Sequence, residues 1–419
     1  MDKLNRSIIC IDLKSFFASC ECIEKNLNPF TFPLVVANPK QGKGALTLAV
    51  TPYLKTLGVK SRGRLYEIPK NIKYYITKPQ MSLYMKKSKE VNDIYLDFVA
   101  SEDLYVYSID ECFLDVTNYL KLYNKTDYEL ALDILNKVKE KTKLTAVVGI
   151  GPNMLLAKVA MDVEAKHNKD CIAKWDYKDI PLKLWNISPL SKMWGIGPRM
   201  EKKLNQMKLY SIGDIAKMDK MVLKQRFGTI GEDIWNHANG INTTLLKDLN
   251  NYKVKEQSYS HSQVLFKDYN DKNIGIIINE MVEMLTARLR HNNKECIGVG
   301  LGIDYSKNVG GSFYHQIKLD VPTDNNKEII KVCNLIFDRF YENLPIRKIT
   351  ISLNGLIPKV GKQLNLFEEA KTTKKEESIN KVIDKIKSKY GKNSLLKASN
   401  LLKDSTAIER NKKIKGHDE

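Results

Sequence analysis

Short apolar runs and helical repeats follow one another in a definite order over the first 175 residues. Residues 7–11 (SIICI), 104–116 and 145–150 (TAVVGI) are rich in the residues of buried strands, whereas residues 83–99 and 128–142 repeat apolar side chains at helical spacing. The order strand, helix, long insertion, strand, strand, helix, strand, helix is typical of a split βαβ, ferredoxin-like sheet. Such a sheet can bring side chains from distant segments next to one another.

Acidic residues stand at two strand ends of this predicted sheet. Asp12 directly follows the first strand, and Asp110 and Glu111 lie where the flanking β-rich residues would form a tight hairpin. Enzymes that transfer phosphoryl groups from nucleoside triphosphates use two divalent cations roughly 3.5 to 4 Å apart, which carboxylate oxygens hold. Either acidic feature alone is common in solvated turns. Their joint occurrence in this strand order predicts a metal site.

A glycine-containing turn precedes a basic helix. Gly149 to Asn153 join the strand at 145–150 to a helix that would begin at Pro152, and backbone N–H groups there could face an anion, with Lys158 two turns along. This interpretation predicts a triphosphate site. The alternative is a plain strand-to-helix turn with Lys158 on a solvated face.

A second pair of glycines lies within a helical region. Gly195, Ile196 and Gly197 stand between two helical patterns, and Pro198 takes a first helical position. The pattern is typical of a helix-hairpin-helix, in which glycines let backbone amides approach a DNA phosphate without reading sequence. A corner between two packed helices is the alternative.

The remainder of the chain divides into a helical region, a second domain and a tail. Past residue 175 the pattern is helical up to a boundary near 245–255. Residues 256–357 alternate strands with amphipathic helices at 274–290 and 327–342, which predicts a second α+β domain.

The tail is basic. From residue 359 on, 16 Lys and Arg stand against 9 Asp and Glu, and we expect a mobile segment. Within it, Gln363 to Phe367 form an apolar cluster that suits a hydrophobic groove on a partner, with packing on its own domain as the alternative.

The whole sequence carries an excess of basic residues. It has 68 Lys and Arg against 49 Asp and Glu, a net charge of +19, which indicates a polyanionic partner and favours nucleic acid. No apolar run reaches the roughly 18 residues of a membrane span, and no signal-like start precedes Asp12, so we expect a cytoplasmic, nucleoid-associated protein without membrane contact. The seven scattered cysteines form no CxxC pair, which argues against a disulfide framework or a zinc site.

Four motifs together resemble those of the Y-family translesion DNA polymerases, in the same order. They are Asp12-Leu-Lys-Ser-Phe-Phe-Ala-Ser-Cys-Glu21, Ser108-Ile-Asp-Glu-Cys-Phe-Leu-Asp115, Gly149-Ile-Gly-Pro-Asn-Met-Leu-Leu-Ala-Lys158 and the Gly195-Ile196-Gly197 hairpin. The resemblance runs from the N-terminus to about residue 367. Ser262-Gln-Val-Leu resembles the UmuC-like branch (ImpB/MucB/SamB type) more than the DinB branch.

The resemblance implies an α+β multidomain fold arranged as a right-hand polymerase. The implied parts are a ferredoxin-like palm at 1–15 and 80–175, small fingers at 16–79, a helical thumb with the helix-hairpin-helix at 176–245, an α+β little finger at 255–358, and a basic tail with a clamp-binding peptide at 359–419.

Metal ligands carry over motif by motif. Asp12, Asp110 and Glu111 correspond to the catalytic ligands of two Mg²⁺ ions, for which Mn²⁺ can substitute. The backbone carbonyl of Leu13 joins them.

Nucleotide-binding residues carry over as well. Phe17 matches the steric gate, an aromatic ring that would clash with a ribose 2′-OH and so selects deoxynucleotides. Its neighbour Phe16 falls at the same nucleotide site and better suits core packing. Lys55 and Lys158 would grip the triphosphate, although many DinB-like members have a Tyr and an Arg where this chain has Pro52 and Lys55, and a lysine offers a point charge in place of a bidentate fork.

The implied function is error-prone, DNA-directed DNA synthesis across lesions by two-metal nucleotidyl transfer, in DNA repair and the SOS response. The implied partners are primer-template DNA, dNTPs, a UmuD-like accessory subunit, a recombinase filament, and a sliding β clamp bound by Gln363, Leu364, Leu366 and Phe367. Two alternatives stay open. A nucleotidyl cyclase on a similar palm conflicts with the helix-hairpin-helix and the second α+β domain. A UmuC-like DNA-binding damage-response subunit, inactive or dependent on another subunit, conflicts with the intact acids.

Overall fold

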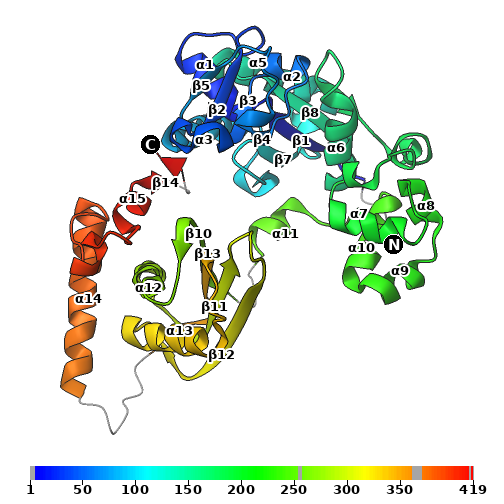
Figure 1. Cartoon of the computed structure of the whole chain (residues 1–419). Helices are drawn as coiled ribbons and strands as arrows, with labels where there is room; N and C mark the ends of the chain where they lie inside the picture. The colour runs from blue at the N-terminus through cyan, green and yellow to red at the C-terminus, as the bar shows by residue number, and fades with distance from the viewer. Residues whose placement is uncertain (1–4, 253–256, 361–369, 415–416, 419) are drawn as a thin grey trace. The chain divides into compact units, whose positions relative to one another are not determined.

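The computed structural model describes residues 5–252, 257–360, 370–414 and 417–418 (Figure 1). Residues 5–252 and 417–418 belong to one compact unit, and the other described residues form a second one. The predicted clamp-binding residues, Gln363, Leu364, Leu366 and Phe367, lie outside these ranges. Every helix of the described ranges is too short or too polar to cross a membrane.

A five-stranded sheet organises the first unit. Its strand order is β6-β7-β1-β8-β9, in which β1 runs antiparallel to both of its neighbours and β8 runs parallel to β9. This mixed sheet with its crossing helices confirms the predicted α+β fold. The strands are β1 (Ile8–Leu13), β6 (Leu104–Val106), β7 (Glu111–Asp115), β8 (Ala146–Gly151) and β9 (Ile172–Lys174).

Side-chain alternation along β1 decides which residues face which helices. Ile8 and Cys10 share an apolar cluster with residues of helix α6 (Met154–Ala160), whereas Ile9 and Ile11 point to the opposite face. Asp12 has the same parity as Ile8 and Cys10 and therefore lies on the α6 side. The opposite side carries α3 (Met81–Tyr95) and α5 (Asp127–Thr142), which pack against each other, and α5 also packs on β8.

Residues between α1 (Phe16–Glu24) and α3 form a second, smaller sheet that the sequence did not predict. Its order is β4-β3-β2-β5, with β2 and β3 antiparallel and β2 parallel to β5. The elements of this region are β2 (Leu34–Ala37), η1 (Pro39–Gly44), β3 (Leu46–Val50), α2 (Pro52–Thr56), β4 (Gly63–Arg64), η2 (Leu65–Glu67) and β5 (Tyr75–Thr77).

Short helices make up the rest of the first unit, around a core that includes Trp175, Leu184 and Leu204. Trp194 joins this helical region to the sheet, because its indole Nε1 donates a hydrogen bond to the hydroxyl of Tyr107 at 3.3 Å. The helices are η3 (Ser101–Asp103), α4 (Tyr119–Tyr123), the π-helical turn η4 (Met161–Ala165), η5 (Tyr177–Asp179), η6 (Ile180–Leu184), η7 (Leu190–Lys192), α7 (Pro198–Asn205), α8 (Ile212–Lys217), α9 (Lys220–Phe227), α10 (Thr229–Ala238) and α11 (Leu246–Asn250).

The second unit contains a four-stranded antiparallel sheet in the order β10-β13-β11-β12 and two helices whose apolar faces pack on it. These elements agree with the predicted second α+β domain. They are β10 (Tyr259–Tyr269), α12 (Ile274–His291), β11 (Lys294–Tyr305), β12 (Ser312–Thr323), α13 (Asn326–Phe340) and β13 (Ile346–Pro358).

The expectation of a mobile tail is wrong for residues 378–413. Helix α14 (Ala370–Tyr390), η8 (Ala398–Leu401) and α15 (Ala407–Asn411) belong to the second unit, and their polar side chains pair with α12. The short strands β14 (Lys413–Ile414) and β15 (His417–Asp418) follow. The high charge content of this segment predicted disorder, but several of its basic residues form ion pairs with acidic residues of α12.

Candidate active site

Strand register places two of the predicted acids side by side. Asp12 lies directly opposite Glu111 on the adjacent antiparallel strand, so both side chains project from the α6 face of the sheet. The backbone N–H of Leu13 donates to the carbonyl of Asp110 at 3.0 Å, which brings the third acid to the same edge. Residues about one hundred positions apart in sequence therefore meet at one point.

The hairpin between β6 and β7 fixes Asp110. The backbone N–H groups of Tyr107 and Ser108 both donate to the carbonyl of Glu111, which closes a tight turn. The hydroxyl of Ser108 donates to Asp110 Oδ1 at 2.7 Å. Ser108 thus orients the carboxylate of Asp110, a contact that no motif in the sequence predicts.

Two lysines neutralise the acids on β1 and β7. Lys166 Nζ lies 2.5 Å from Asp12 Oδ2, and Lys158 Nζ lies 2.8 Å from Glu111 Oε1. Asp162 links the two lysines, at 3.0 Å from Lys158 and 2.8 Å from Lys166. Asp162 and Lys166 were not predicted, although their i+4 and i+8 spacing from Lys158 places them on one helical face and could have indicated them.

Burial and mutual pairing shift the pKa values of this cluster. Desolvation raises the pKa of both Asp12 and Glu111, and the nearby ammonium groups offset only part of that rise. Burial acts to lower the pKa of Lys158 and of Lys166, but surrounding anionic groups more than compensate, so both pKa values are raised. The cluster therefore holds half-buried carboxylates that need cationic partners.

Carboxylate oxygens are the ligands that Mg²⁺ prefers, so the chemistry of the donor set fits a divalent metal. The side chains of Asp12 and Glu111 are only 18% and 11% exposed, and each oxygen that an ammonium group now contacts could serve a metal ion instead. Within the described ranges no three acidic, His or Cys side chains converge closely enough to hold a metal ion as they stand. Metal binding would thus require the carboxylates themselves to move closer together, as well as release of the oxygens that Lys158 and Lys166 contact.

A cavity of about 720 Å³ opens beside the acids. Predicted residues that line it are Asp12, Leu13, Phe16, Phe17, Lys55, Asp110 and Glu111, and residues that were not predicted are Ser15, Leu48, Ala49, Val50, Ser61, Arg62, Tyr107, Ser108, Ile109 and Lys166. The cavity has the size of a small-molecule site and carries cationic groups opposite carboxylates. Such a lining suits a metal-bound polyphosphate.

Phe16 and Phe17 take different environments. Phe16 is 2% exposed and belongs to the core, whereas Phe17 is half-buried at the cavity wall. The ring of Phe17 stacks on Tyr84 with centroids 4.5 Å apart and planes 23° apart. The structure thus presents the aromatic ring of Phe17 at the edge of the cavity.

The Gly149 to Asn153 turn does not form the expected anion site. All its residues are buried, and Asn153 caps α6 by accepting a hydrogen bond from the N–H of Leu156. A Cβ on Gly149 would lie 2.0 Å from the carbonyl oxygen of Ala157, so this glycine permits close helix packing. Lys158 is likewise 7% exposed and faces Glu111, outside the lining of the cavity.

The predicted helix-hairpin-helix residues lie before α7. Ile196 is buried in the core of the helical region, whereas Gly195 and Gly197 are exposed. Gly195 has φ of +91°, a conformation that favours glycine, and no atom lies within 4 Å of a Cβ built on Gly197. The backbone here is accessible to a bulky anionic group.

Comparison with known proteins gives consistent relatives over nearly the whole chain. Residues 11–162 match the impB/mucB/samB family, residues 256–366 match its C-terminal domain, and residues 177–209 match the IMS family HHH motif. "Putative UV-damage repair protein UvrX" of Bacillus subtilis (strain 168) is 37% identical over 98% of this chain and 97% of its own length. "DNA polymerase IV 2" of the same strain is 31% identical over 98% of each protein.

One solved structure shares the fold. The Y-family DNA polymerase chimera Dbh-Dpo4(243-245)-Dbh matches with a TM-score of 0.65 at 18% sequence identity, over 84% of this chain and 99% of its own.

Proposed function

This chain belongs to the impB/mucB/samB family, and we propose that it is a DNA-directed DNA polymerase that carries out error-prone synthesis across damaged template. The observation that carries the proposal is the meeting of Asp12, Asp110 and Glu111 at one wall of the cavity. Its substrates are primer-template DNA and dNTPs, and its setting is DNA repair, including the SOS response.

The acids would hold two Mg²⁺ ions, with the Leu13 carbonyl as a further ligand. When bound, the ions activate the primer 3′-hydroxyl and neutralise the leaving pyrophosphate. Ser108 keeps the carboxylate of Asp110 in place, and Lys166 is positioned at the cavity wall, where it could turn from Asp12 toward a triphosphate. Lys55 faces the same space and would add a second positive charge.

Phe17 would select the sugar. Its ring stands at the cavity wall and is held from behind by Tyr84, so a ribose 2′-OH placed against it would meet a side chain that cannot withdraw. Gly195, Ile196 and Gly197 would bind a DNA phosphate without reading sequence.

Partners beyond the substrates follow from the family. Gln363, Leu364, Leu366 and Phe367 would bind a sliding β clamp, and a UmuD-like subunit or a recombinase filament would act with the enzyme in the cytoplasm. A second candidate function is a UmuC-like DNA-binding subunit that is inactive alone.

Primer extension tests the proposal. With a primer-template, dNTPs and Mg²⁺ the chain should elongate the primer, and Asp110→Ala should slow elongation by roughly 100-fold or more, since metal ligation contributes several kcal/mol to transition-state stabilisation. Asp93→Ala is the matched control, because Asp93 is an exposed acid on α3 outside the cavity.

Two outcomes would contradict the polymerase assignment. One is the absence of elongation together with an unchanged Asp110→Ala variant. The other is tight DNA binding without incorporation under any supplementation, which would favour the subunit that is inactive alone.

A further inference from the structure

Three lysines form a stripe along the solvent-facing side of α14. Lys381, Lys385 and Lys389 are all exposed, and they follow one another at intervals of four residues. Because an α-helix rises about 1.5 Å per residue, their side chains recur roughly every 6 Å along one face. We call these three residues the α14 lysine stripe.

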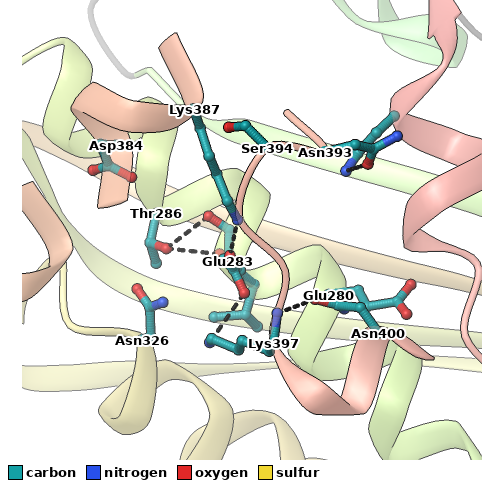
Figure 2. A network of polar contacts seen from close by, with 12 residues as sticks. Glu280, Glu283, Thr286, Asn326, Asp384, Lys387, Asn393, Ser394, Lys397 and Asn400 are labelled. Carbon is teal, nitrogen blue, oxygen red and sulfur yellow. Dashed lines mark hydrogen bonds and ion pairs between the residues drawn. The ribbon is translucent and has the colours of Figure 1, made fainter. Parts of the chain in front are cut away.

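The opposite side of α14 is anchored to the second unit by charge pairs. Asp384 accepts two hydrogen bonds from Arg290 of α12, at 2.6 and 3.2 Å. Lys387 pairs with Glu283 of α12 at 2.5 Å, a contact that Figure 2 shows from close by. The half-buried residues of α14, among them Ile383, lie on this same side. The helix is therefore held in a fixed rotation about its axis, with the lysine stripe outward.

Residues that follow α14 reinforce the anchoring. Lys397 is a second partner of Glu283, at 3.0 Å (Figure 2). Glu280, whose side chain is 1% exposed, pairs with Arg410 at 3.3 Å and accepts a hydrogen bond from Ser405 at 2.6 Å. The acidic groups of α12 thus neutralise the basic groups that face them.

The stripe has no such compensation among the side chains that the structure describes from residue 378 on. Across the described residues no ion pair with an acid involves Lys381, Lys385 or Lys389. In the sequence, residues 385–403 contain six lysines and no acidic residue. Within residues 378–390, the basic groups that face α12 are paired with acids and the outward lysines have no described acidic partner, so this part of α14 presents positive charge to solvent.

We propose that the α14 lysine stripe is a DNA-binding surface that contacts the phosphate backbone of duplex DNA, in addition to the contacts near the active site. Evenly spaced ammonium groups suit the regularly spaced phosphates of a DNA strand, and such contacts do not depend on the base sequence. A lysine stripe could also serve as a solvated face, or meet an anionic membrane, since Ile379 and Val382 beside it are 48% and 55% exposed. Duplex DNA is favoured because the lysines, and not the apolar residues, occupy the centre of the outward face.

Salt dependence of DNA binding tests this surface. The full chain and the variant K381Q/K385Q/K389Q are titrated with a fluorescent primer-template without dNTPs, between about 50 and 200 mM salt. Each phosphate contact contributes about 0.9 to the slope of log affinity against log salt, so loss of three contacts lowers the magnitude of the slope by about 2.7. Between about 50 and 200 mM salt, the affinity of the variant should therefore fall by a factor roughly 40 times smaller than that of the unaltered chain. K381R/K385R/K389R should keep the slope of the unaltered chain.

A charge-matched control separates local contact from net charge. K272Q/K307Q/K331Q removes the same three charges from exposed, dispersed positions of the second unit and should change the slope far less. Equal slopes for the two glutamine variants, or no change in either, would overturn the proposal. So would loss of binding to phosphatidylserine vesicles in K381Q/K385Q/K389Q with DNA binding unaltered, because the surface would then be a membrane contact.

The readout does not depend on catalysis, so the two proposals fail separately. If the chain elongates no primer, the salt dependence of its DNA binding can still decrease in K381Q/K385Q/K389Q, and the DNA-binding surface would then stand without the polymerase assignment. Conversely, a chain that elongates primers normally but shows the same slope in all variants would retain its polymerase assignment and lose this one.

Discussion

Phe16 and Phe17 differ in burial because consecutive helical residues point about 100° apart. Both residues line the cavity, but α1 buries Phe16 in the core and leaves the ring of Phe17 half-exposed. Behind Phe17, the hydroxyl of Tyr84 donates to Glu21 at 2.8 Å, and Glu21 is fully buried and also accepts from Gln80. A side chain held in this way has little freedom to yield to a bulkier sugar.

Replacement of Phe17 by Ala should admit ribonucleotides. The space left by the ring accommodates a 2′-OH, and the preference for dNTP over rNTP should fall tenfold or more, about 1.4 kcal/mol of lost discrimination. The measurement is single-nucleotide incorporation with matched dNTP and rNTP. Phe17→Tyr, which keeps the ring, is the control, and an unaltered dNTP preference in Phe17→Ala would remove the gate assignment.

Among single residues, those fixed by strand register are predictable and those fixed by side-chain pairing are not. Asp12 and Glu111 end up opposite each other because apolar runs define β1 and β7. The helical spacing of Lys166 from Lys158 places both on one face of the helix, but no pattern in the sequence pairs Lys166 with Asp12, which lies on β1 more than 150 residues away.

At the level of elements, length decides what the sequence reveals. The second α+β domain is predictable because β11 and β13 are long and α12 and α13 have clear apolar faces. The small sheet of the first unit is not, because β4 has two residues and β5 has three, too few to show an alternating pattern. The docking of α14 depends on charge pairs with residues of α12 that lie about one hundred positions away in sequence. Local sequence patterns do not reveal contacts between segments so far apart.

The anchoring of α14 should weaken on acidification or in Glu283→Gln. Burial tends to raise the pKa of Glu283, but Lys387 and Lys397 more than offset this, so its folded-state pKa lies below the ordinary value of 4.5. A depressed pKa means that the charge pairs stabilise the docked state above about pH 4.5, and that this stability is lost as the pH falls through the folded-state pKa. Loss of this half-buried partner should cost roughly 1 to 2 kcal/mol.

Amide hydrogen exchange measures this effect at neutral pH. Residues 378–390 should exchange faster in Glu283→Gln, while the sheet of the second unit keeps its protection. Glu342→Gln is the control, since Glu342 is an exposed acid of the same unit and pairs with no described side chain of α14. Equal protection of α14 in both variants would mean that the pairs with Glu283 contribute nothing to docking.

For the whole chain, the proposed clamp-binding peptide would set how long the enzyme stays on its template. Residues 363–367 lie in sequence between β13, which ends at Pro358, and α14, which begins at Ala370. A clamp-binding peptide in this position would connect the second unit to a ring on DNA. Such a link raises the local enzyme concentration at the primer end without any new contact to the substrate.

Substitution of Leu364, Leu366 and Phe367 by Ala should therefore separate synthesis from its stimulation. Without a clamp, the variant should extend primers at the rate of the unaltered chain, because every described residue that lines the cavity is left unaltered. With a loaded β clamp, the unaltered chain should make longer products per binding event, by up to about 10²-fold, and the variant should not. Leu401→Ala/Leu402→Ala is the matched control, since both leucines are exposed and belong to the same C-terminal region. If the triple variant responds to the clamp as the control does, the peptide packs on its own chain and the tether lies elsewhere.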